Sequence, residues 1–159
     1  MRKLLVGIHD KNCSLRAVAW VMSQYTDPAE LEVRLVHVFP DLPTMYWDDG
    51  HVLTAGEDQD RRKVIDAWMA RQRDYVGPIL EGAANELVRH GVPRARVATK
   101  FLLGTSDVAD TLLDEAAAEK FGTIVVGRCG IADGRHFLVG SVVSKLIQKA
   151  AGVAVCVVQ

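Results

Sequence analysis

Five short apolar runs, separated by helical patterns, constrain the fold of this chain more than any other feature. The runs are rich in Val, Ile and Leu, and most lack the alternation of apolar and polar residues that marks a half-exposed strand. Continuous apolar runs are typical of strands covered on both faces, as in a parallel sheet. We therefore expect strands at residues 4–8, 33–39, 97–103, 123–127 and 153–158.

Between these runs, apolar residues recur at the spacing i, i+3, i+4 of an amphipathic helix. Strands that alternate with helices over 159 residues predict a single domain, an open and mostly parallel α/β sandwich with right-handed crossovers. Gly77-Pro78 interrupts the second and longest helical pattern, so we expect a kink or a break there. The helices are expected around residues 15–22, 64–87 and 108–116, and from residue 141 onward.

A long irregular loop is expected at about residues 40–56, which follow neither the helix nor the strand period. A connection of this length is unusual in a compact domain. Two interpretations stay open. It is a solvated loop leading into a helix whose first turn favours carboxylates such as Glu57 and Asp58. Alternatively, it covers a ligand or binds a partner through Tyr46 and Trp47.

Composition and charge argue against several classes of function. The chain has 19 Lys and Arg against 20 Asp and Glu, so it lacks the basic surplus of a nucleic-acid-binding protein. Its three scattered cysteines have no CxxC spacing and indicate free thiols in a reducing compartment. No apolar run approaches the roughly 18 residues that cross a bilayer, and the N-terminal segment lacks a signal-peptide pattern. We expect a cytoplasmic protein with no nucleic-acid and no membrane partner.

Glycines surround the point where the fourth strand ends and the last helix begins. Gly127 and Gly130 follow the fourth apolar run, and Gly140 and Ser141 open the last helical pattern. Glycine lets the backbone approach an anion and adopt positive φ, while a helix start offers N–H groups and the positive end of the dipole. Ser141 is also a residue type that caps helices. A nucleotide or another phosphate is therefore the leading ligand.

The spacing Gly127-x2-Gly130-x9-Gly140-Ser141 resembles the nucleotide-binding signature of the ATP-binding subgroup of the universal stress protein family. The likeness extends over the whole chain, from Leu4-Leu5-Val6-Gly7-Ile8 to the closing Val153–Val158 segment. It implies one domain over residues 1–159, with an open five-stranded parallel sheet and helices on both faces. This fold is Rossmann-like and adenine nucleotide alpha hydrolase-like. The resemblance also implies a homodimer formed through the C-terminal strand, together with an unknown protein partner.

The resemblance further assigns the ligand ATP, with ADP, AMP and an accompanying Mg²⁺ left open. The ends of the first two strands would hold ribose and adenine, with Val38 meeting the adenine. Arg128 would neutralise phosphate charge. The expected binding residues are Ile8, His9, Asp10, Val38, Gly127, Arg128, Gly130, Gly140, Ser141 and Val142.

One segment departs from the family pattern. ATP-binding members usually carry Asp-Gly-Ser directly after the first strand, where the Asp holds the ribose, and here the aligned residues are His9-Asp10-Lys11. His9 is either a donor to a hydroxyl or a turn residue without a ligand role. Near the glycines, Cys129 is either a redox-active thiolate or a small residue that fits. Arg135 and His136 are either phosphate partners or exposed loop residues.

Three functions follow from these residues. The first is a nucleotide-binding stress-response and signalling module that acts through dimer or partner interactions. The second is a nucleotide-free interaction protein of the same fold, in which the glycine loop is structural. The third is an enzyme of a related nucleotide-binding group, for which no catalytic residues are found. The loop lacks the Gly-Lys-Ser/Thr of a P-loop, an obvious base and a dedicated Mg²⁺ carboxylate, so any ATP hydrolysis should be slow.

Overall fold

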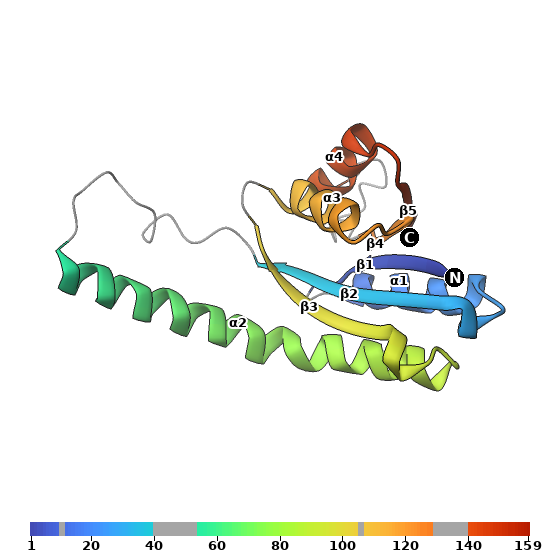
Figure 1. The fold of residues 1–159 in the computed structure, drawn as a ribbon, viewed down its shortest axis with the longest axis horizontal. Coiled ribbons are helices and arrows are strands. Elements are labelled where there is room, and N and C mark those ends of the chain that lie inside the picture. The colour runs from blue at the N-terminus through green and yellow to red at the C-terminus, as the bar shows by residue number, and fades with distance from the viewer. Residues whose placement is uncertain (10–11, 40–53, 105–106, 129–139) are drawn as a thin grey trace.

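A computed structural model describes residues 1–9, 12–39, 54–104, 107–128 and 140–159. It shows a five-stranded sheet in the order β3-β2-β1-β4-β5, in which every neighbouring pair is parallel (Figure 1). The α/β fold and the parallel five-stranded sheet are therefore confirmed. The strands are β1 (Arg2–Gly7), β2 (Leu31–Phe39), β3 (Val97–Leu103), β4 (Thr123–Gly127) and β5 (Ala154–Val158).

Helices connect these strands and cover both faces of the sheet. The described α-helices are α1 (Asn12–Gln24), α2 (Ala55–Arg89), α3 (Val108–Ala118) and α4 (Ser141–Lys149). Two short 3-10 turns, η1 (Pro28–Glu30) and η3 (Arg94–Arg96), lead into β2 and β3. In the described part of the chain, no helix is both long enough and apolar enough to cross a membrane.

The sheet separates two apolar clusters because successive strand residues point to opposite faces. Leu4 and Val6 of β1 pack with α1 and α2 on one face, whereas Leu5 between them packs with α3 and α4 on the other. All three side chains are buried. Burial on both faces explains why the strand sequences are continuous apolar runs instead of alternating ones.

Helix α2 runs without interruption through Pro78 over 35 residues. The break predicted at Gly77-Pro78 is therefore wrong. Proline removes one helical hydrogen bond and crowds the preceding turn, but the side chain of Pro78 is exposed. The neighbouring Val76 and Leu80 are buried against the sheet. Tertiary packing of this apolar face holds the helix together across the proline.

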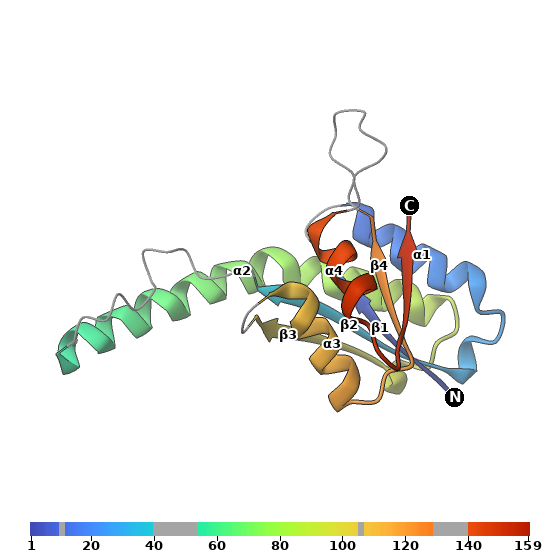
Figure 2. The ribbon, with the colours of Figure 1, turned by 90° about the horizontal axis from the view of Figure 1, so that it is seen from above.

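The N-terminal half of α2 extends past the ends of the strands, as both views of the ribbon show (Figures 1 and 2). The helix begins at Ala55, several residues before its apolar pattern starts, because Thr54 and Glu57 form a capping box. The Thr54 side chain accepts a hydrogen bond from the Glu57 N–H, and the Glu57 carboxylate accepts one from the Thr54 N–H. Glu57 and Asp58 lie in the first turn, as the solvated-loop interpretation expects. Residues 40–53 lie outside the described residues.

Strands β3 and β5 form the two edges of the sheet. The C-terminal strand β5 pairs only with β4 among the described strands, and most of its side chains are half-buried or exposed. Cys156 lies at the centre of this strand and is half-buried. Burial raises the pKa of its thiol, so it is not an activated thiolate.

A buried carboxylate links α3 to the sheet. Glu115 accepts hydrogen bonds from Arg34 Nη1 at 3.0 Å and from Lys100 Nζ at 2.9 Å. Burial alone would raise the pKa of Glu115, but the hydrogen bonds from Lys100 and Arg34 outweigh it and hold the pKa below its ordinary value. This network connects β2, β3 and α3.

We expect Glu115→Gln to lower the free energy of unfolding by about 2 kcal/mol near neutral pH, because it breaks a mostly buried ion pair whose Lys100 partner is partly exposed. A carboxyl group with a lowered folded pKa stabilises the protein above its unfolded pKa. The stabilisation disappears as the pH falls through the folded pKa. Urea unfolding of both proteins across a pH series should therefore show a difference that shrinks in acid. A difference independent of pH would contradict this assignment.

Candidate functional site

A cavity of about 720 Å³ opens at the carboxyl ends of the strands. The chain proceeds from β1 to β2 and β3 on one side and places β4 and β5 on the other, so a topological switch point lies between β1 and β4. Ligands of open α/β sheets bind at such points. The ends of β1, β2 and β4 line the cavity, together with parts of α2 and α3 and the N-terminal end of α4.

The structure brings together most of the residues that the sequence predicted for ligand binding. Arg128 is described but does not line the cavity: its N–H donates to the Val158 carbonyl at 2.6 Å, and its own carbonyl accepts from Arg16. Asp10 and Gly130 lie outside the described residues, as do Cys129, Arg135 and His136. The predicted residues that line the cavity are Ile8, His9, Val38, Gly127, Gly140, Ser141 and Val142.

The end of β1 is held in place by side-chain hydrogen bonds. Ser14, which is buried in α1, accepts a hydrogen bond from the His9 N–H at 2.9 Å and donates one to the His9 carbonyl at 2.8 Å. His37 of β2 is also buried, and its Nδ1 lies 2.8 Å from the Ile8 carbonyl. Because a carbonyl only accepts, Nδ1 carries the proton of this bond. These contacts fix the backbone on which His9 sits.

The N-terminal end of α4 faces the cavity without a side-chain cap. Its N-cap residue is Gly140, which makes no side-chain cap hydrogen bond, and Ser141 is the first helical residue. The expectation that Ser141 caps the helix is therefore wrong. The first turn contains no acidic residue, and a helix start leaves backbone N–H groups without intrahelical partners. This end of α4 is chemically suited to an anion.

Gly140 has a φ of −58°, a value that any residue adopts, so positive φ does not explain the glycine. A Cβ atom at this position would meet no atom of the described residues within 4 Å, its two chain neighbours aside. The backbone of α4 thus tolerates a side chain here. Glycine is itself a common N-cap residue, and here it also leaves the backbone open to close approach by a ligand.

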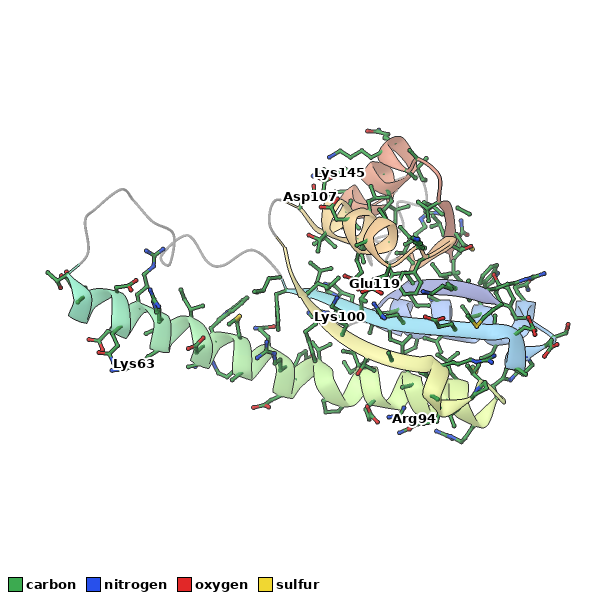
Figure 3. All side chains as sticks on the ribbon, viewed as in Figure 1. Lys63, Arg94, Lys100, Asp107, Glu119 and Lys145 are labelled. Carbon is green, nitrogen blue, oxygen red and sulfur yellow. The ribbon has the colours of Figure 1, made fainter. Side chains whose placement is uncertain are left out.

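Ion pairs link the start of α3 to the middle and the end of α4. Asp107, the N-cap of α3, accepts hydrogen bonds from the Ala109 N–H at 2.7 Å and the Asp110 N–H at 3.4 Å, and it pairs with Lys145 of α4 (Figure 3). The hydrogen bond from Lys145 holds the pKa of Asp107 below its ordinary value. One turn further along each helix, Lys149 pairs with Asp110 at 2.7 Å.

Apolar side chains form most of the cavity wall. Val36 and Val38 of β2, Leu112 of α3 and Val126 of β4 contribute to it. Among the described residues that line the cavity, none is Asp, Glu, Lys or Arg. An apolar pocket with a few polar groups is typical of a small-molecule site, and the described lining residues include no carboxylate that would repel an anion. Over the described residues, no group of three or more His, Cys, Asp and Glu side chains is placed to hold a metal ion.

Sequence reasoning missed the wall that α2 contributes. Gln72, Tyr75 and Val76 of this helix line the cavity, as do Ser14 and His37. No motif identifies these residues, because their position depends on how α2 packs across the sheet. One signal was present in the sequence: Gln72 is polar, although it lies at a position of the apolar face of α2.

Comparison with known protein families gives one match. The sequence model described as the universal stress protein family matches residues 1–158. No curated protein sequence matches the chain.

Solved structures with the same fold include proteins of that family. The protein MJ0577 superposes with a TM-score of 0.69 at 20% identity, covering 99% of this chain and 94% of that one. A universal stress protein from Archaeoglobus fulgidus in complex with dAMP gives 0.60 at 18%, covering 100% and 98%. A family member from Arabidopsis thaliana with AMP bound gives 0.55 at 16%, covering 99% and 91%.

Proposed function

Because this chain belongs to the universal stress protein family, we propose that its cavity binds an adenine nucleotide, with ATP as the ligand and ADP and AMP as alternatives. The observation that carries the proposal is the composition of the cavity. It combines an N-terminal helix end without a side-chain cap with the ends of three parallel strands at a topological switch point. Two family members with this fold hold dAMP and AMP.

The phosphates would lie between β4 and α4. Gly127 ends β4, and Gly140, Ser141 and Val142 begin α4 on the opposite side of the same cavity. N–H groups at a helix start and the dipole of the helix both favour negative charge there. Gly130 would complete this phosphate site, and Arg128 would add positive charge.

The nucleoside would lie across the ends of β1 and β2. Ile8 and His9 would border the ribose, and Val38 would meet the adenine through its backbone. His9 would donate from a ring nitrogen to a ribose hydroxyl, at the position where ATP-binding members carry an Asp. Asp10, one residue further along, would supply the ribose contact if the register shifts by one.

The module would act by binding more than by catalysis. The described lining residues include no carboxylate and no lysine to activate water or hold Mg²⁺. Hydrolysis would therefore be slow at most. Nucleotide binding would change the interactions of the protein with a second copy or with a partner protein in a stress response.

A homodimer would form through β5. This strand is at one edge of the sheet, where its unpaired side is available to a second strand. Two copies of the Val-rich strand would cover each other, and the half-buried Cys156 would then lie at or near the interface.

The alternative function is a nucleotide-free interaction protein of the same fold. The specific observation in its favour is His9, which stands where the ribose-binding Asp of ATP-binding members is expected. In that case the glycines near α4 would serve the fold alone.

Mass spectrometry of the native protein and calorimetric titration with ATP, ADP and AMP separate the two functions. The nucleotide-binding module is expected to retain a nucleotide on purification or to release heat with at least one of the three. Absence of both at millimolar nucleotide would leave the interaction protein as the better account.

We expect His9→Asp to raise the affinity for ATP roughly tenfold, because a carboxylate accepts stronger, charge-assisted hydrogen bonds from ribose hydroxyls. Calorimetry measures the change. His9→Asn is the matched control, since it places a neutral acceptor at the same point and should give a smaller gain. Equal affinities in all three proteins would show that residue 9 does not contact the ribose.

A further inference from the structure

A single polar side chain interrupts the apolar face of α2 beside the cavity. Between Ile65 and Leu87, the buried and half-buried positions of this fully described helix are apolar or glycine except for Gln72. Gln72 lies four residues after Trp68 and four before Val76, so the three side chains form one row along the helix. A helix face that packs on a sheet is stabilised by apolar residues. An amide at this position costs free energy unless it has a hydrogen-bonding partner.

The amide of Gln72 has no such partner within the protein as described. It makes no hydrogen bond in the described parts of the chain, is half-buried, and lines the cavity. Tyr75, one turn away and 62% exposed, lines the cavity beside it. A glutamine amide carries two donor hydrogens and an acceptor oxygen. These groups are available to a ligand in the cavity.

The position of Gln72 in the cavity indicates which part of a bound nucleotide its amide would contact. The cavity crosses the ends of β4, β1 and β2, and neighbouring strands lie ~4.8 Å apart, so β2 is roughly 10 Å from β4. A phosphate held between Gly127 and Gly140 therefore places the far end of the ligand at β2. The Trp68 ring lies 6.2 Å from the ring of Phe39, the last residue of β2. Neither ring lines the cavity, but Gln72, one turn further along the helix, does, and α2 packs against β2. Gln72 therefore lies on the β2 side of the cavity.

We propose that Gln72 determines base specificity by recognising the edge of a 6-aminopurine. Its carbonyl oxygen would accept a hydrogen bond from the exocyclic amine, and its N–H would donate to the ring nitrogen N7, which is the pairing that glutamine makes with adenine. A 6-oxopurine presents an acceptor where the amide oxygen needs a donor. This proposal rests on the proposed function, which places the phosphates at the other end of the cavity.

The test compares AMP with inosine monophosphate, its 6-oxo analogue, by calorimetry on the full-length chain. The wild-type protein is expected to bind AMP about tenfold more tightly, the discrimination of one good bidentate pair. Gln72→Leu should bring the two affinities together while leaving the weaker binding of ribose 5-phosphate, which has no base, unchanged. Gln59→Leu is the matched control, because Gln59 is an exposed residue of the same helix. It should behave as the wild type.

A second variant keeps a polar side chain but cannot make the bidentate pair. Gln72→Glu places an acceptor-only carboxylate at the same point, which still accepts from the exocyclic amine but repels the lone pair of N7. It should weaken AMP binding about tenfold. Thermal unfolding checks that both variants fold. If Gln72→Leu does not fold, the test relies on Gln72→Glu alone.

The outcomes separate this inference from the proposed function. Equal affinities of the wild type for AMP and inosine monophosphate would overturn the role of Gln72 and leave nucleotide binding intact. So would AMP affinities in Gln72→Leu and Gln72→Glu that equal the wild-type value. Failure of the wild type to bind any of the nucleotides would overturn both proposals.

Discussion

Gly140→Asp is expected to weaken ATP binding about a hundredfold while leaving the protein as stable as before or more so. The described residues leave room for the side chain, since none of them beyond the two chain neighbours lies within 4 Å of a Cβ at this position and φ is ordinary. Aspartate is a favourable N-cap and would complete the uncapped start of α4. Its carboxylate would also occupy the proposed phosphate site and repel the ligand, and like-charge contacts cost several kcal/mol. Calorimetry and thermal unfolding measure the two effects separately.

The matched control for this variant is Gly56→Asp. Gly56 lies in the first turn of α2, also with nothing within 4 Å of its Cβ, and the substitution makes the same change of charge away from the cavity. ATP affinity should stay at the wild-type value. Gly140→Asn, which adds similar bulk without charge, separates steric exclusion from repulsion. Undiminished ATP affinity in Gly140→Asp would exclude the start of α4 as the phosphate site.

Leu80→Ala is expected to lower the free energy of unfolding by about 3 kcal/mol, the second large effect. Leu80 is only 1% exposed and belongs to the cluster that α1 and α2 form with the sheet. Truncating a buried leucine removes apolar contacts and leaves a cavity, at a total cost of about 2 to 5 kcal/mol. Urea unfolding measures the change, which corresponds to a fall of roughly 10 °C in the melting temperature of a chain of this size.

The matched control is Leu15→Ala in α1, because Leu15 is 43% exposed. The same substitution there should cost less than about 1 kcal/mol. A loss below that value for Leu80→Ala would contradict the conclusion that the buried face of α2 carries this helix across Pro78.

The sheet was predictable because burial on both faces leaves a direct trace in the sequence. β3 and β4 have the predicted boundaries, whereas β2 begins two residues early at Leu31, where it pairs with Arg2 of β1. The start of α2 was not predictable from periodicity. Its first turns carry no apolar stripe and are defined by the Thr54–Glu57 capping box. The break predicted at Pro78 does not occur because local propensity is weaker than packing.

The candidate site likewise contains residues that the sequence could predict and residues that it could not. The residues near α4 follow β4 in sequence, so a motif could indicate them, and the ends of β1 and β2 follow from the geometry of a parallel sheet. Gln72 and Tyr75 reach the cavity only because α2 crosses the sheet from a distant part of the chain. Such long-range placement has no local signature. The only sign of this placement in the sequence is a polar residue, Gln72, within an otherwise apolar helix face.

The central position of β1 has a consequence for how the chain is made. β1 leaves the ribosome first and can pair with β2 early, but its other neighbour, β4, begins at Thr123. At 5–20 residues per second, roughly 5 to 20 s of synthesis separate the completion of β2 from that of β4. Throughout this interval one edge of β1 has no partner strand, and such edges recruit other chains. Each nascent copy is therefore most exposed to pairing with other chains until β4 has been made.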